Sequence, residues 1–206
     1  MRTWIAVAAA AVVIAAAGTA SWLLLREEDG VRPATFRSEP NTAHYAPIAT
    51  RALDPEPLTA AEVFPAGPIA SGGVALTGGN PESLTDCASA VWGSAEAAVA
   101  GCTQALRAGY TSADGRIAGQ FLIFNLADSA AADRLVAAFG RDGFVRPASG
   151  LPEAFDGARG WAQARALGHY VTVSWVAPAG PGTRVDLTHP QLAVDALGFA
   201  VQRRLV

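Results

Sequence analysis

The stretch CTQALRAGYTSADGRIAGQFLIFNLAD, residues 102–128, decides the fold class that the sequence predicts. Two extended runs, residues 102–111 and 116–126, flank the letters SADG, and an Asp-Gly pair is a turn signal between strands. The second run is apolar at both odd and even positions, which is typical of a central strand with both faces buried. We therefore expect a β-hairpin in the middle of a sheet.

A helix and a second hairpin are expected after this stretch. The helix is expected to start at a cap on Asp128 or Ser129 and to run to about Phe139, where a glycine follows. β-branched and aromatic residues over 161–176, on both sides of Gly168, predict the second hairpin.

Two more helices are predicted from their N-terminal signals. Asn80, Pro81 and Glu82 are residue types that favour the start of a helix, which we expect to end at Gly93. Thr188 is expected to start the last helix. The side of that helix expected to be buried holds Leu192, Ala193, Ala196, Leu197, Ala200 and Val201.

The order helix, hairpin, helix, hairpin, helix predicts an α+β fold. An antiparallel sheet of four or five strands, with helices packed mainly on one face, satisfies this order. We place the globular domain at residues 58–206, where Thr59 and Glu62 form a capping-box pattern before a short helix.

Composition excludes several classes of function. The 206 residues are 51% hydrophobic and only 16% charged, against about 25% charged in typical soluble chains. Each of the 15 basic residues is an arginine, so chemistry that needs a lysine amine, such as a Schiff base, is excluded. The net charge of −3 provides no basic footprint for nucleic acid.

The N-terminal region predicts a membrane segment. Residues 4–25 carry no charge and would form about 33 Å of helix, enough to cross a hydrocarbon core of about 30 Å. We expect an uncleaved signal anchor in the cell membrane, with residues 1–3 in the cytoplasm and the rest outside. The alternatives are a signal peptide cleaved near Ala20, which would give a secreted protein, and a buried helix.

Residues 26–57 contain many prolines and no regular periodicity, so we expect an extended extracytoplasmic stalk. The expected partners are the lipid bilayer, through residues 4–25, and another membrane or envelope protein. The alanines of the span would allow close helix packing in lipid.

Cys87 and Cys102 are the only cysteines of the chain. In an oxidising compartment we expect them to form a disulfide, which requires Cα atoms within about 7 Å, whereas a continuous helix would separate them by about 22 Å. The chain must therefore reverse between them. Two buried free thiols are the alternative, and neither cysteine has another ligand at the spacing of a metal site.

No catalytic, cofactor or metal site is predicted. His44, His169 and His189 lie in no metal-binding motif, and the nucleophile motif G-x-S-x-G does not occur. Aromatic residues and one arginine are candidates for a ligand or partner surface, with packing in the core as the alternative. These candidates are Trp92, Arg107, Tyr110, Trp161 and Trp175.

The motifs DCASAVWG (86–93), GCTQALRAGYTSADG (101–115), FNLAD (124–128) and LTAAEVFP (58–65) carry a resemblance. The chain resembles actinobacterial single-span membrane proteins of unknown function with an extracytoplasmic α+β domain. The resemblance extends over residues 58–178, and it implies a lineage and a topology but no activity.

These observations favour a non-catalytic, membrane-anchored extracytoplasmic domain that binds an unknown ligand or partner. An envelope hydrolase whose active site is assembled from distant residues is the first alternative. A structural spacer is the second.

Overall fold

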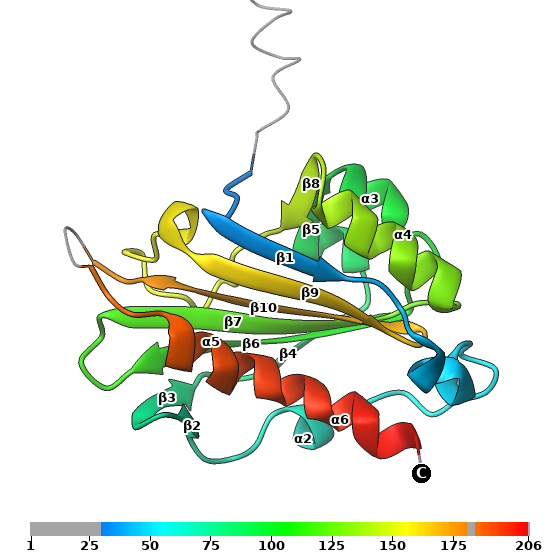
Figure 1. The fold of residues 1–206 in the computed structure, drawn as a ribbon, viewed down its shortest axis with the longest axis horizontal. Coiled ribbons are helices and arrows are strands. Elements are labelled where there is room, and N and C mark those ends of the chain that lie inside the picture. The colour runs from blue at the N-terminus through cyan, green and yellow to red at the C-terminus, as the bar shows by residue number, and fades with distance from the viewer. Residues whose placement is uncertain (1–29, 181–183, 206) are drawn as a thin grey trace, which may run out of the picture.

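The computed structural model describes residues 30–180 and 184–205. One large sheet dominates these ranges and curls into a half-barrel (Figure 1). Its eight strands are β1 (Thr35–Glu39), β2 (Ile69–Ser71), β3 (Val74–Gly78), β4 (Glu82–Leu84), β6 (Gln104–Ser112), β7 (Ile117–Asn125), β9 (Trp161–Leu167) and β10 (Tyr170–Pro178). A separate pair consists of β5 (Val91–Gly93) and β8 (Gly143–Val145).

The strand order of the large sheet is β1-β9-β10-β7-β6-β3-β2, and β4 pairs with β6 beside β3. The two expected hairpins, β6–β7 and β9–β10, are confirmed, and β7 and β10 pair antiparallel at the centre. Gly115 and Gly168 have positive φ at the two turns, a conformation that glycine adopts without steric cost.

The expected sheet of four or five antiparallel strands, with helices mainly on one face, is wrong. β1 pairs in parallel with β9, so the sheet is mixed, and helices lie on both faces. The reason is that β7 and β10 carry apolar residues on both sides, and each side needs a cover. The helices are α2 (Ala60–Val63), α3 (Ser94–Ala98), α4 (Ser129–Phe139), α5 (Thr188–Asp195) and α6 (Phe199–Gln202).

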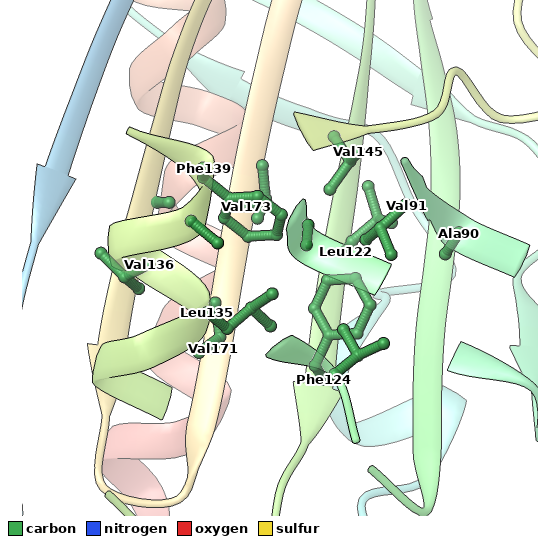
Figure 2. Close-up of a cluster of buried hydrophobic side chains, with 14 of the residues drawn as sticks. Ala90, Val91, Leu122, Phe124, Leu135, Val136, Phe139, Val145, Val171 and Val173 are labelled. Carbon is green, nitrogen blue, oxygen red and sulfur yellow. The ribbon is translucent and has the colours of Figure 1, made fainter. Parts of the chain in front are cut away.

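The first face packs against α4, α3 and the β5–β8 pair. Asp128 caps α4 as expected, because its carboxylate accepts a hydrogen bond from the amide of Ala131. Figure 2 shows the side chains of α4 directed toward those of β7 and β10. The labelled residues of this core are Ala90, Val91, Leu122, Phe124, Leu135, Val136, Phe139, Val145, Val171 and Val173.

The second face packs against a helical rod, which we define as residues 188–205. The rod consists of α5, the 3-10 turn η4 (Ala196–Gly198), α6 and the 3-10 turn η5 (Arg203–Leu205). Val194 and Val201 of the rod are fully buried in the cluster that includes Phe121 and Ile123 of β7. The rod crosses this face of the sheet, and α2 lies beside it (Figure 1).

The helix expected over residues 80–93 is wrong. That segment forms β4, the 3-10 helix η2 (Cys87–Ala90) and β5. β4 pairs with β6, which places Glu82 opposite Arg107, and this long-range pairing overrides the local helix signals. Asp86 caps η2 instead, with its carboxylate accepting from the amide of Ala88.

Residues 30–57, where we expected a stalk, pack on the domain. They contain β1 and the 3-10 helix η1 (Ala43–Ile48), and Ile48 is 2% exposed. Arg32 also donates hydrogen bonds to the carbonyl oxygens of Phe139 and Gly143.

The expected membrane span and the alternative cleavage point near Ala20 lie outside the described residues. Within the described part of the chain, no helix is long and apolar enough to cross a bilayer. One further 3-10 helix, η3 (Gly157–Arg159), precedes β9.

Candidate partner-binding surface

The expected disulfide between Cys87 and Cys102 is confirmed. Their Cα atoms are 6.2 Å apart, and 15 positions separate them in sequence. β5 and α3 lie inside the closed loop and provide the chain reversal that the pairing requires. The bridge therefore fastens η2 to the segment that leads into β6.

The five residues expected to form a ligand or partner surface do not lie together on the outside. Trp92 and Trp175 belong to the core on the first face, whereas Tyr110 belongs to the core on the second. Trp161 is half-buried at the start of β9. Burial raises the pKa of Tyr110 to about 12, so its hydroxyl stays protonated.

Arg107, the remaining candidate, is engaged in an ion pair. Its guanidinium lies 2.6 Å from the Glu82 carboxylate, which also accepts a hydrogen bond from the Ser149 hydroxyl at 2.8 Å. The hydrogen bond from Arg107 is the main reason that the pKa of Glu82 lies below its ordinary value of 4.5. Arg107 thus fastens β4 to β6.

The exposed large apolar residues indicate a different surface. Leu192 is 52% exposed and Phe199 is 57% exposed, and both lie on the outer side of the rod. Ala196 and Arg203 are exposed on the same side. We call the side formed by Leu192, Ala196, Phe199 and Arg203 the outer stripe of the rod. Of these four residues, Arg203 contacts α2 by donating a hydrogen bond to the carbonyl oxygen of Glu62.

Two grooves run along the rod, and Phe199 lines both. The first groove, of about 600 Å³, separates the rod from the segment that links β1 to η1. The second, of about 400 Å³, separates it from α2 and β2. The Phe199 side chain therefore lies between the two grooves.

Arg165 and two carboxylates form the floor of the first groove. Arg165 donates to Glu39 at 2.8 Å and to Asp195. Asp195 also accepts from the Ser174 hydroxyl at 3.1 Å, and that hydroxyl accepts from the Gln191 amide at 2.8 Å. Because Ser174 and Gln191 are buried, this chain of hydrogen bonds fixes α5 to β9 and β10.

A second polar cluster fixes the C-terminal end of the rod. The Tyr170 hydroxyl donates to Asp54 at 2.8 Å, and Arg204 pairs with both Asp54, at 2.8 Å, and Glu62, at 3.1 Å. Burial, together with the bond to Asp54, raises the pKa of Tyr170 well above its usual range. The rod is therefore held through α5 and at its C-terminal end.

Each of the three histidines contacts another residue of the folded chain. His169 is fully buried, and its ring Nδ1 lies 2.9 Å from the carbonyl oxygen of Ile48. Desolvation lowers the pKa of His169, so the ring is neutral and Nδ1 donates to that carbonyl. His189 lies 3.5 Å from the Ser71 hydroxyl, and His44 packs edge-on against Tyr45.

Among residues 30–180 and 184–205, no three His, Cys, Asp or Glu side chains come together in a group that could hold a metal ion.

The prediction that Leu192 and Ala196 lie on the buried side of the last helix is wrong, because both are exposed. The apolar residues of that helix outnumber the positions that face the sheet, and Ala193, Val194 and Leu197 occupy those positions instead. The signal that identifies the outer stripe is a second apolar series, at 192, 196 and 199, beside the buried one.

Comparison with known proteins identifies no relative. No protein-family model, no curated protein and no solved structure matches the chain. The resemblance to actinobacterial single-span proteins therefore rests on the sequence motifs, and it stays a prediction.

Proposed function

We propose that this chain is a membrane-anchored extracytoplasmic domain that acts by binding a partner rather than by catalysis, and that the outer stripe of the rod with its two grooves is the binding surface. The observation that carries the proposal is the exposure of Leu192 and Phe199 on the rod, where Phe199 lines two hollows. Contiguous apolar patches on a folded surface mark interaction sites.

Energetics support a role in binding. Burying a Leu or Phe side chain is worth about 1.5–3 kcal/mol, and these two leave much of that free energy unused in the isolated chain. The clusters around Arg165 and Arg204 hold α5 and the C-terminal end of the rod before any partner arrives. A surface that is already ordered loses little conformational entropy on association.

Two observations support the location outside the membrane. Disulfides such as Cys87–Cys102 persist in oxidising compartments. The uncharged residues 4–25 have the length of a membrane span.

The test is cross-linking in intact cells. A photo-reactive phenylalanine analogue replaces Phe199 in one variant, and Ala137, an exposed residue of α4 on the other side of the sheet, in the control. We expect a discrete covalent adduct from position 199 and none from position 137. Equal labelling at the two positions, or no adduct at position 199, would refute the proposal.

A further inference from the structure

We infer that the partner is a second copy of this chain, and that the outer stripes of two rods pack antiparallel about a two-fold axis. This inference rests on the proposed function, because it names the occupant of the same surface.

The spacing of the outer stripe is that of a helix-packing seam. Leu192, Ala196, Phe199 and Arg203 follow one another at steps of four, three and four residues, which is the a/d spacing of paired helices. Neighbouring positions on the rod, such as Ala193 and Ala200, are buried against the sheet. The rod therefore has two apolar sides: one packs against the sheet, and the outer stripe is the second.

The seam is complementary to itself when the two rods run antiparallel. With the axis near Ala196, Leu192 of one copy lies against Phe199 of the partner subunit, and the reverse contact follows by symmetry. The small Ala196 side chains at the axis let the two backbones approach closely. The grooves on either side of Phe199 offer space for the larger side chains of the opposite copy.

Charges at the two ends of the rod favour the same direction. Asp186, which accepts a hydrogen bond from the amide of Thr188, is exposed just before the rod begins. Arg203, which donates to the carbonyl oxygen of Glu62, is exposed near the end of the rod. In the antiparallel arrangement Thr188 lies opposite Arg203 of the partner subunit, so Asp186 comes near that arginine at both ends. Exposed ion pairs add little affinity, but they select one orientation over the other.

The direction of the two-fold axis agrees with a membrane anchor. The two-fold axis that relates two antiparallel rods lies in the plane between them and is perpendicular to both. In this molecule that direction runs across the rod, from the second groove toward the first. The segment leading into β1 lies on the side of the first groove (Figure 1). Residues 30–34 of both copies therefore lie at the same end of the dimer, as two anchors in one bilayer require.

The seam is short, about 17 Å from residue 192 to residue 203, so the groove rims must contribute to an interface of ordinary size. Anchoring two copies in one membrane raises their effective concentration. A modest interface is then sufficient for pairing.

The test uses Ala196→Cys in the full chain, expressed in membranes and treated with a mild oxidant. Cys87 and Cys102 are joined to each other, so the introduced thiol is the reactive one. We expect a disulfide-linked dimer from Ala196→Cys and none from the matched control Ala137→Cys. Adding Phe199→Glu should weaken the dimer at least tenfold, since an interface anchor becomes a buried charge.

A second pair of variants tests the orientation. Leu192→Cys and Phe199→Cys, co-expressed on differently tagged copies, should form a mixed dimer because the antiparallel rods bring these positions together. Cross-linking that is equal for Ala196→Cys and Ala137→Cys, or absent from both Ala196→Cys and the mixed pair, would overturn the homodimer. A photo-adduct of position 199 with a different protein would also overturn it but would leave the proposed binding function in place.

Discussion

At the scale of single residues, arginine side chains connect segments of this chain that are distant in sequence. Arg32, Arg51, Arg203 and Arg204 donate hydrogen bonds to backbone carbonyl oxygens far away in sequence. The planar guanidinium can bind two acceptors at once, which a lysine ammonium does less well because it is a compact point charge. A chain without lysine thus uses its basic residues to hold loops on the sheet.

Glu82 makes stability depend on pH at this scale. Its pKa is below 4.5 in the folded chain, so its contribution is fully present above pH 4.5 and is lost as the pH falls through the folded value. We expect Glu82→Gln to cost at most about 1 kcal/mol at neutral pH, because the pair is partly exposed. The melting temperature of the variant should then fall less steeply than that of the wild type below about pH 5.

Melting curves followed by circular dichroism across this pH range provide the measurement. Glu153→Gln, at an exposed position, is the matched control and should follow the wild type. If Glu82→Gln also follows the wild-type pH dependence, the ion pair with Arg107 does not contribute to stability as described.

At the scale of elements, the helices and strands that the sequence predicts correctly are those that local signals and long-range pairing both favour. The β6–β7 and β9–β10 hairpins, α4 and the capping box of Thr59 and Glu62 agree with the structure for this reason. β1 could not be found, because its parallel partner β9 lies more than a hundred residues further along the chain. The segment 80–93 carries helix signals, but pairing with β6 outweighs them.

The Cys87–Cys102 bridge makes a prediction about the elements that it encloses. A closed loop of 15 residues is worth about 3 kcal/mol in the chain-entropy description. The double variant Cys87→Ser/Cys102→Ser should lose about that much free energy of unfolding in urea. Reductant should destabilise the wild type by a similar amount and leave the double variant unchanged.

Alkylation before and after reduction provides an independent check. The thiol reagent should modify neither cysteine in the folded, unreduced chain and both after reduction. Modification of both without reductant would show that the bridge is absent.

At the scale of the whole molecule, the half-barrel has one face covered by α3, α4 and β5–β8 and the other by a rod that keeps an apolar side outward. The sequence predicts the two central hairpins and α4, but neither the number of strands in the sheet nor which side of the last helix faces out. That choice depends on the curvature of the sheet and on the clusters around Arg165 and Arg204, whose members come from distant parts of the chain. The residues that form the candidate surface are therefore determined only by the packing of the rod on the sheet.

The central claim is that the domain lies outside the membrane with the outer stripe of its rod covered by a partner. The most direct measurement is labelling of Ala196→Cys and Ala137→Cys in intact cells with a maleimide that does not cross membranes. We predict that Ala137→Cys labels readily in cells, whereas Ala196→Cys labels well only after purification and dilution in detergent, which separate the chain from its partner. No labelling of Ala137→Cys in intact cells, or equal labelling of the two variants there, would contradict the account.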